Sequence, residues 1–343
     1  MAETATCFFV YLRKTAKILL FAESGTGNLF EFYLGIYVII EIKFKQILKF
    51  VTVFCCSDNS MGLMRRYSLN VKGRILLLDN PLVMGILNVT PDSFYEGSRI
   101  ATSDDLVVRA KAMIDEGADI LDIGACSTRP SGCPVTESEE LRRLHAVLDV
   151  VDSELPDAVV SVDTFRASVA RECVERHNVS IVNDVSGFSW DEAMLETVAG
   201  LNVPYVLTHS QGWAGESAVY KDFLPEVLQV LSQKMWQLRQ LGVNDVIIDP
   251  GFGFGKSLHQ NYCMMAHLKE FAMLEAPVLV GVSRKSMISK VLGTTSDEAL
   301  NGTTVLNTHA IMSGADILRV HDVKQAKEAV KICSAIKAAN MAG

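Results

Sequence analysis

The feature that most constrains this chain is a series of eight short apolar runs, each ending in polar residues. They read VMGILN, DILDIG, AVVSVD, SIVND, PYVLTH, DVIID, PVLVGVS and DILRV, and helix-like stretches separate them. Near-continuous apolar strands that alternate with amphipathic helices are typical of a parallel sheet covered by helices. Eight such units between Leu82 and Ala338 predict an α/β fold, a (β/α)8 TIM barrel in one domain, which needs about 250 residues.

The segments between the runs predict the covering helices. Ser103 is a candidate N-cap, with Asp104 and Asp105 in the first turn, where acidic groups are favourable. Thr136 followed by Glu139 matches a capping box. The predicted helices span 103–116, 136–151, 166–176, 191–199, 224–241 and 323–338.

Composition and charge narrow the class of protein. Apolar residues make up 49% of the chain, which is enough for a core and argues against intrinsic disorder. The net charge of −8 argues against general affinity for nucleic acid or anionic membranes, so an anionic substrate requires a local group of cations. The eight cysteines include no CxxC pair, which argues against a zinc site or a disulfide framework and indicates a reduced, cytoplasmic protein.

The first sixty residues differ in character from the rest. Their apolar stretches are interrupted by charges such as Glu41, Lys43 and Lys45, and no run reaches the roughly 18–20 residues that span a membrane. A signal peptide is also poorly supported, because no small-residue cleavage site is clear. We expect residues 1–60 to be either a divergent N-terminal extension or sequence translated upstream of a true start at Met61. The barrel domain is then 61–343.

Polar residues collect where the apolar runs end. In a barrel of alternating strands and helices, the active site lies at the C-terminal ends of the strands. The residues expected at that rim are Asn88, Asp163, Asn183, His209, Asp249, Lys285, Arg319 and His321. The set predicts a site that holds a ring with many hydrogen-bonding edges beside an anion, although each residue alone also fits a turn or a packed support, as we expect for His209.

Two motifs carry the most specific chemistry. In IIDPGFGFGK, the Asp249 carboxylate can accept two hydrogen bonds from an amidine-like edge such as that of a pterin. The alternating glycines indicate a mobile lid in which Phe252 and Phe254 swing. In SRKS, Lys285 can donate to a carbonyl or a ring nitrogen, while Ser286 and free backbone N–H groups face an anion. The alternative for the Asp249 segment is an ordinary loop with a capping aspartate. The alternative for SRKS is a basic turn exposed to solvent.

The remaining candidates point to an anion and a metal. Arg319 and His321 in LRVHD can stack on a ring or grip phosphate. Thr128 and Arg129 lie in the Pro/Gly loop STRPSG, which suits a phosphate that is bound and later released. Asn88 can coordinate hydrated Mg²⁺ through its side-chain oxygen, or it can hold a loop in place.

The order of these motifs resembles the bacterial dihydropteroate synthase family, the target of sulfonamides. GILNVTPDSF, STRP, VDT, VND, DPGFGFGK, GVSRKS and RVHD occur in that family's order and roughly its spacing, from about Pro81 to the end. The resemblance implies a transferase that condenses 7,8-dihydropterin-6-ylmethyl diphosphate with 4-aminobenzoate, giving 7,8-dihydropteroate and pyrophosphate in folate biosynthesis. It also implies Mg²⁺ as cofactor and a homodimer through the late helices.

The resemblance assigns roles to particular positions. Asp163, Asn183, Asp249 and Lys285 would hold the pterin, with Arg319 on its face, and Asp163, Lys285, Arg319 and His321 would be catalytic. Asn88, Thr128, Arg129, Arg319 and His321 would receive the diphosphate, with Asn88 on the metal. Phe94, Thr128, Pro130, Phe254 and Ser286 would frame the aminobenzoate. Loss of pyrophosphate would leave a delocalised cation that the arylamine attacks, with the loops after the first two strands excluding water.

Two positions depart from the family's pattern. Cys126 stands where the family usually has Glu before STRP, which removes an anchor for that loop. Ser210 stands where Met commonly follows the fifth-strand His, which removes a polarizable contact to the ring. Both departures bear on affinity for substrates or sulfonamides.

Two rival functions remain open. A corrinoid-linked methyltransferase would share the pterin-binding carboxylates, but SRKS and STRP would have no use in it. A non-catalytic pterin-binding protein would be expected to lack Asn88, Arg129, Lys285 or His321, and all four are present.

Overall fold

A computed structural model describes residues 67–89, 103–126, 135–210 and 222–342 of the 343-residue chain. The predicted extension 1–60, its boundary with the barrel domain and most of the two loops that follow the first two strands lie outside the described residues. Phe94, Thr128, Arg129 and Pro130 are therefore not placed, and their predicted roles stay predictions.

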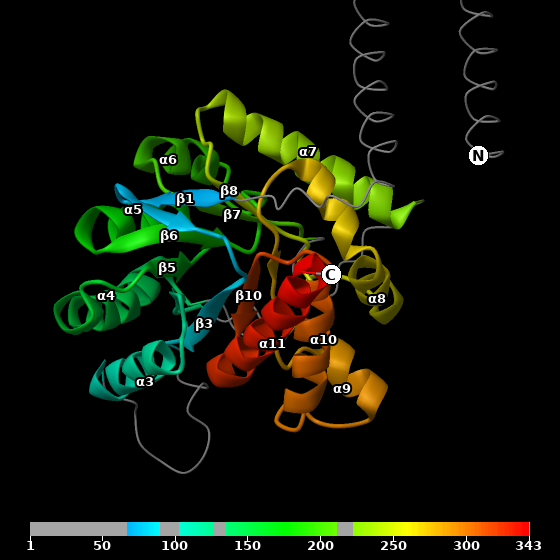
Figure 1. The fold of residues 1–343 in the computed structure, drawn as a ribbon. Helices are drawn as coiled ribbons and strands as arrows, with labels where there is room; N and C mark the ends of the chain where they lie inside the picture. Colours follow the sequence, from blue (N-terminus) through cyan, green and yellow to red (C-terminus); the bar gives the residue numbers. More distant parts are fainter. Residues whose placement is uncertain (1–66, 90–102, 127–134, 211–221, 343) are drawn as a thin grey trace, which may run out of the picture. The chain divides into compact units, whose positions relative to one another are not determined.

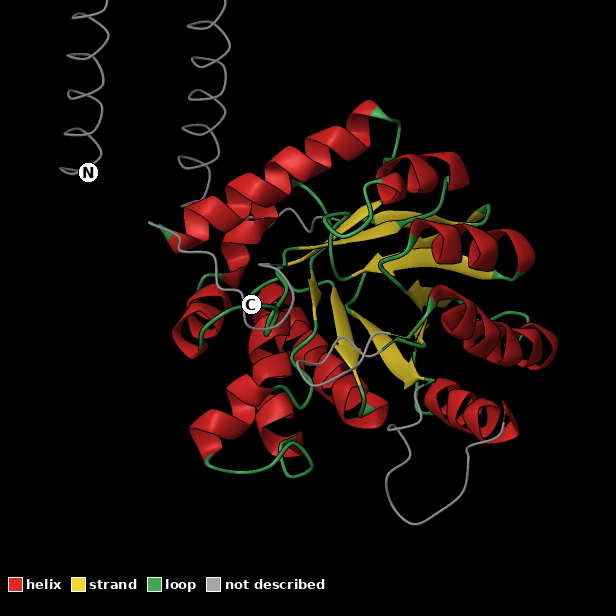
Figure 2. Ribbon diagram, turned by 180° about the vertical axis from the view of Figure 1, so that it is seen from behind, coloured by secondary structure: helices red, strands yellow, loops and turns green. Residues whose placement is uncertain are grey.

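Eight parallel strands form a barrel (Figures 1 and 2). They are β3 (Leu82–Asn88), β4 (Ile120–Gly124), β5 (Val160–Asp163), β6 (Val179–Asp184), β7 (Tyr205–Thr208), β8 (Val246–Asp249), β9 (Leu279–Val280) and β10 (Ile317–Val320). Their order in the sheet is β8-β7-β6-β5-β4-β3-β10-β9. A parallel bridge between Ile248 and Val278 joins the two outer strands and closes the ring. The predicted (β/α)8 barrel is confirmed.

The seventh strand is shorter than the apolar run PVLVGVS predicts. Only Leu279 and Val280 pair as a strand. Pro277 has no N–H to give to a ladder, although its carbonyl accepts a 2.8 Å bond from the Ile248 N–H. The rest of the run, beginning at Gly281, leads to the turn that carries Lys285.

Helices surround the barrel on its outer side (Figure 2). Those near predicted bounds are α3 (Ser103–Asp115), α4 (Glu137–Glu154), α5 (Ala167–Arg176), α6 (Ala193–Leu201), α7 (Phe223–Gln240) and α11 (Val323–Ala342). The others are α8 (Leu258–Ala266), the 3-10 helix η3 (Leu268–Leu274), α9 (Ser286–Leu292) and α10 (Leu300–Met312).

Only one of the two hydrogen bonds of the predicted capping box is present at the N-terminus of α4. The Thr136 hydroxyl accepts the Glu139 N–H, as the motif requires. The Glu139 carboxylate, however, pairs with Arg142 and Arg143 at 2.7 Å instead of returning to the cap. Two arginines within one turn offer stronger partners than a neutral backbone N–H.

A hairpin that the sequence did not predict packs against one end of the barrel. β1 (Ser68–Val71) and β2 (Arg74–Leu77) pair antiparallel, and Lys72 and Gly73 have φ of 51° and 83°, as a type I′ turn needs. Leu69 and Val71 join an apolar cluster with residues from the barrel strands, including Met84 and Ile120. The hairpin therefore completes the core inside the barrel, at the N-terminal ends of the strands.

A second, larger core lies between the strands and the helices. Leu121, Val162 and Leu207 face it from the barrel, and Leu144 and Leu231 face it from α4 and α7. With apolar side chains filling both cores, the polar residues of the strands concentrate at their C-terminal ends. Within the described residues, no helix is long and apolar enough to cross a membrane.

Candidate active site

The ends of the barrel strands place the predicted residues around one rim. Asn88 ends β3, Asp163 ends β5 and Asp249 ends β8. Asn183 lies one residue before the end of β6, beside Asp163 in the sheet. Parallel register therefore brings together residues that are far apart in the sequence.

Arg319 on β10 lies between two carboxylates. Its Nε donates to Asp122 Oδ2 at 2.6 Å, and its Nη2 donates to Asp163 Oδ2 at 2.5 Å. The Asn183 side-chain amide donates to the same Asp122 oxygen at 2.9 Å. The pterin-binding candidates Asp163, Asn183 and Arg319 thus form one network with Asp122 as its shared member.

Asp122 is the member that the sequence prediction missed. It lies inside β4, in the run DILDIG, and is fully buried. An acidic residue within an otherwise apolar strand is a signal in itself, because a carboxylate is rarely buried without a partner. The sequence could not identify that partner, since Arg319 follows 197 residues later.

Burial sets the charge states of this network. It raises the pKa of Asp163, an effect that the Arg319 guanidinium opposes and the Asp122 carboxylate reinforces. Burial opposes charge on Arg319 too, but the carboxylates of Asp122 and Asp163 more than offset it and raise its pKa. One permanent cation, the Arg319 guanidinium, therefore lies between the carboxyl groups of Asp122 and Asp163.

The DPGFGFG segment after β8 is held by Lys256. Its ammonium donates to the carbonyls of His209 and Gly251, each at 2.7 Å, and to that of Phe254 at 3.4 Å. The Gly251 N–H donates to Asp249 Oδ1 at 2.7 Å, which fixes one oxygen of that carboxylate. Burial lowers the pKa of Lys256 to about 7. Sequence reasoning also missed this lysine.

The expectation that Phe252 swings in a mobile lid is wrong. Phe252 is fully buried in the outer core, and only Phe254 is partly exposed. Gly251, Gly253 and Gly255 have φ of 73°, 85° and 68°. At Gly251 the left-handed path brings the backbone against the His209 carbonyl, where a Cβ would lie 2.0 Å from the oxygen, so close packing accounts for this glycine.

Lys285 lies against this segment. Its ammonium donates to the Phe252 carbonyl at 2.5 Å and stands 4.6 Å from the centre of the Phe254 ring. Burial lowers the pKa of Lys285 to about 8, although Asp249 acts to raise it. Burial raises the pKa of Asp249, and Lys285 opposes that shift. Two predicted pterin-binding groups therefore influence each other's charge.

His321 and Ser283 hold each other at the end of β10. Ser283 Oγ accepts the His321 backbone N–H at 3.2 Å and lies 3.0 Å from His321 Nδ1. If the hydroxyl accepts from the backbone, its own hydrogen is free to donate to Nδ1. That assignment puts the imidazole proton on Nε2, which can then donate to an anion. Ser286 opens α9 nearby in sequence and is exposed.

Two arginines hold the chain on either side of the undescribed residues 127–134. Arg143 donates to the Ala125 carbonyl at 3.4 Å, and Arg166 donates to the Val135 carbonyl at 2.7 Å. Arg166 is itself paired with buried Glu140. These contacts fix the described residues Ala125 and Val135, and the predicted effect of Cys126 on the loop between them lies outside the described residues. His209 is 2% exposed, and burial lowers its pKa to about 2, which agrees with a supporting role.

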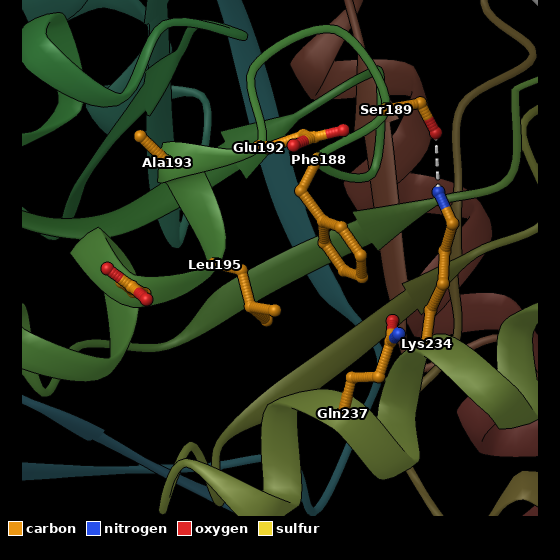
Figure 3. A pocket seen from close by; sticks show the side chains of 8 residues that line it. Phe188, Ser189, Glu192, Ala193, Leu195, Lys234 and Gln237 are labelled. Carbon is orange, nitrogen blue, oxygen red and sulfur yellow. Dashed lines mark hydrogen bonds between the residues drawn. The ribbon is translucent and has the colours of Figure 1, made fainter.

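A hollow of about 620 Å³ lies elsewhere, between α6, α7 and the loop before α6. In Figure 3, Lys234 reaches across it to Ser189, a 2.6 Å hydrogen bond, and Phe188 and Leu195 line it. None of the predicted site residues lines this hollow. The candidate active site is the set of polar side chains that converge at the strand ends.

Comparison with known proteins identifies what this arrangement is similar to. A family model described as "Pterin binding enzyme" matches residues 84–321. A dihydropteroate synthase of Bacillus subtilis (strain 168) is 42% identical over 260 residues, which cover 75% of this chain and 89% of that relative.

Two solved structures of Xanthomonas albilineans dihydropteroate synthase align closely with the barrel. The structure with 4-aminobenzoic acid aligns with a TM-score of 0.74 and 38% sequence identity, and the alignment covers 79% of this chain and 98% of the Xanthomonas chain. The structure in complex with 7,8-dihydropteroate aligns with a TM-score of 0.72 and 36% sequence identity, and the alignment covers 79% of this chain and 99% of the Xanthomonas chain.

Proposed function

The chain belongs to the dihydropteroate synthases, a family of pterin-binding enzymes, and from that premise we propose how its residues carry the reaction. The enzyme is a transferase that condenses 7,8-dihydropterin-6-ylmethyl diphosphate with 4-aminobenzoate, giving 7,8-dihydropteroate and pyrophosphate. The observation that carries the residue assignment is the convergence of Asp163, Asn183, Asp249, Lys285 and Arg319 at the strand ends.

The pterin ring binds among the buried polar groups. Asp249 is 5% exposed and accepts hydrogen bonds from the amino group and ring N–H of the pterin, a charge-assisted pair. Asn183 and Asp163 meet the opposite edge of the ring. Lys285 donates to a ring acceptor, and Arg319 lies along the ring face while its N–H groups stay on their carboxylates.

The diphosphate binds at the outer part of the rim. His321 donates from Nε2, in the tautomer whose Nδ1 accepts from the Ser283 hydroxyl, and Arg319 contributes positive charge. Thr128 and Arg129, which lie outside the described residues, keep the diphosphate-binding roles that the family resemblance predicts. Because the chain is acidic overall, the arginines of this set supply the local positive charge for an anionic substrate.

We propose Asn88 as the protein's ligand to Mg²⁺. Its side chain is partly exposed at the end of β3, and an amide oxygen is a suitable hard ligand. Among the described residues, no cluster of three histidines, cysteines or acidic side chains could hold a metal by itself. That fits an ion bound by one or two protein oxygens plus substrate phosphate. When bound, Mg²⁺ neutralises negative charge on the diphosphate oxygens.

The aminobenzoate binds over the pterin methylene group. Phe254 offers its ring face beside the Lys285 ammonium, and Ser286 offers a hydroxyl to the carboxylate. Phe94, Thr128 and Pro130 keep the aminobenzoate-binding roles that the family resemblance predicts, and all three lie outside the described residues. The amine then lies near the methylene carbon, and positioning supplies much of the rate enhancement.

The reaction proceeds by loss of pyrophosphate followed by attack of the arylamine. The bond between the methylene carbon and the diphosphate oxygen breaks as Arg319 and His321 stabilise the charge that develops on the leaving oxygen. The carboxylates Asp163 and Asp249 stabilise the cation left on the dihydropterin. The amine lone pair forms the C–N bond, and the nitrogen then transfers a proton to the released pyrophosphate or to water.

Turnover by the purified protein tests this assignment. We expect release of pyrophosphate and formation of dihydropteroate when dihydropterin diphosphate, 4-aminobenzoate and Mg²⁺ are all present. Omission of aminobenzoate should abolish dihydropteroate formation, and a sulfonamide should compete with it. Tight pterin binding without turnover would instead favour the non-catalytic alternative.

Asp249 provides the sharpest single-residue test. Asp249→Ala should weaken pterin binding roughly 100-fold or more, because each hydrogen bond to a charged group contributes about 1.5–3 kcal/mol. Asp245→Ala is the matched control, since Asp245 lies just before the first residue of β8 and accepts a hydrogen bond from the Asn70 N–H. Isothermal titration with a dihydropterin measures both. Equal affinities in the two variants would contradict the assignment.

We also propose that the enzyme is a cytoplasmic homodimer. The four described cysteines are free thiols, as in a reducing compartment. The late helices carry a set of exposed apolar side chains, which we term the α10–α11 patch: Val305, Met312, Ile332 and Ile336. Exposed apolar groups on two helices that pack side by side are suited to burial by a second copy.

A further inference from the structure

Two carboxylates contact the Arg319 guanidinium, but their surroundings differ. Asp163 ends its strand and its side chain is 13% exposed, whereas Asp122 lies inside β4 and is fully buried. Asp163 can therefore meet a ligand at the rim, while Asp122 lies one layer below it. The proposed reaction uses Asp163 and Arg319 and gives no task to Asp122.

The N–H groups of the Arg319 guanidinium donate to both carboxylates. Asp122 takes the Nε–H, and Asp163 takes one hydrogen from Nη2. The same Asp122 oxygen also accepts from Asn183, so one atom fixes two proposed pterin-binding side chains. Asp122 Oδ1 is buried and has no hydrogen-bond partner among the described residues.

We propose that Asp122 is a positioning residue that serves as the standing counter-ion of Arg319, so that Asp163 stays available to the pterin. This inference rests on the proposed function. Without the charge of Asp122, the planar guanidinium could turn one edge towards Asp163 and donate two parallel N–H bonds to its carboxylate. This bidentate geometry is the one that arginine and carboxylate favour. The carboxylate that should accept from the pterin would then be occupied by the arginine.

The charges around this group come from most sides of the barrel. Asp122 is on β4, Asp163 on β5 and Arg319 on β10. The other charged groups that act on Asp163 or Arg319 are Glu140, Asp184, Asp249 and Lys285. Among the described residues, only the Asp122 side chain hydrogen-bonds to the side chains of both Arg319 and Asn183, so removal of its charge should redistribute the network and not merely weaken it.

Asp122→Asn tests the proposal, because the amide has the same shape and lacks the charge. We expect KM for the dihydropterin diphosphate to rise at least about tenfold, with a smaller change in kcat, since a competitor for Asp163 has been created. With Arg319 moved fully to Asp163 and the repulsion from Asp122 gone, the acid limb of kcat/KM should move to lower pH by about one unit.

Asp119→Asn is the matched control. Asp119 lies just before the same strand, at its opposite end, and forms an ion pair with Lys327 at 2.7 Å. Its loss should leave both the KM and the acid limb at their wild-type values. A merely structural role for Asp122 would lower activity without moving the acid limb, and that result would overturn the proposal.

An NMR measurement on the wild-type enzyme tests the same proposal if Asp122→Asn does not fold. In protein labelled with ¹⁵N-arginine, the Nε–H signal of Arg319, assigned with Arg319→Lys, should keep its shift and slow exchange when 7,8-dihydropteroate binds. Rapid exchange of that proton in the complex would overturn the proposal. Failure of the proposed function would be seen separately, as absence of turnover in the wild type.

Discussion

Burial gives the residues of this site charge states that differ from those in water. The pKa of Asp249 and that of Asp163 are raised by burial, and the pKa of Lys285 is lowered to about 8. In the proposed assignment, the pterin requires Asp163 and Asp249 as ionised acceptors and Lys285 as a charged donor. We therefore expect the site to be active in the pH range above the raised pKa values of the two aspartates and below the lowered pKa of Lys285.

These shifts predict a bell-shaped pH dependence of kcat/KM for the dihydropterin diphosphate. Activity should fall as pH drops through the raised carboxyl pKa values, above the ordinary range for aspartate. It should also fall as pH rises through about 8, where Lys285 loses its proton. Steady-state rates across pH 4–10 give both limbs.

Lys285→Arg identifies the alkaline limb, because arginine keeps its charge throughout that range. We expect residual activity in this variant with the alkaline limb moved to higher pH. Titration of the substrate's own phosphate is the same for both proteins and cancels in the comparison. An unmoved alkaline limb would show that a group other than Lys285 controls it.

At the scale of elements, the segment 250–256 is held by close backbone packing. A Cβ on Gly251 would lie 2.0 Å from the His209 carbonyl oxygen, and its φ is +73°. Gly251→Ala should therefore both strain the backbone and displace the segment that positions Asp249. We expect a marked drop in melting temperature and loss of dihydropteroate formation.

Gly242→Ala separates the two effects in that experiment. Gly242 has φ of +84°, but a Cβ there would meet nothing within 4 Å. Its substitution should cost only the left-handed strain of about 1–2 kcal/mol and leave turnover unchanged. If the two alanine variants behave alike in thermal unfolding and turnover, close packing at Gly251 is not what matters.

The hairpin β1–β2 contributes to stability from the end of the barrel opposite to the site. Leu69 is 1% exposed within the inner core, whereas Leu77 on the partner strand is 56% exposed. Leu69→Ala should lower the free energy of unfolding by about 2–5 kcal/mol, as expected for a buried leucine. Leu77→Ala should change it by less than about 0.5 kcal/mol. Urea unfolding followed by circular dichroism compares the two.

At the scale of the whole molecule, the α10–α11 patch is the proposed contact between two copies. Val305 is 59% exposed on α10. Val305→Glu would bury an unpaired charge in the interface and should raise the dimer dissociation constant at least about 100-fold. Val108→Glu, at a 67% exposed position on α3, is the control. Sedimentation velocity should show a monomer for the first and a dimer for the second. A monomeric wild type would contradict the dimer.

Periodicity in the sequence was sufficient for the barrel. Eight apolar runs with helices between them limited the fold to one closed parallel sheet, and the rule for strand ends predicted the rim that carries Asp163, Asn183 and Asp249. Resemblance to a family then supplied the chemistry. The hairpin β1–β2 was missed because each strand has only four residues and its turn is Lys72-Gly73, a weaker signal than Asn-Gly.

The sequence by itself determined the fold and the inventory of reactive groups, because both depend on local periodicity and on residue type. Only the tertiary structure decided which groups meet. It paired Arg319 with Asp122 across 197 residues, buried Phe252, and set Lys256 beneath the glycine segment. Such pairings depend on strand register and on burial in a low-dielectric core, and both quantities exist only once the barrel has closed.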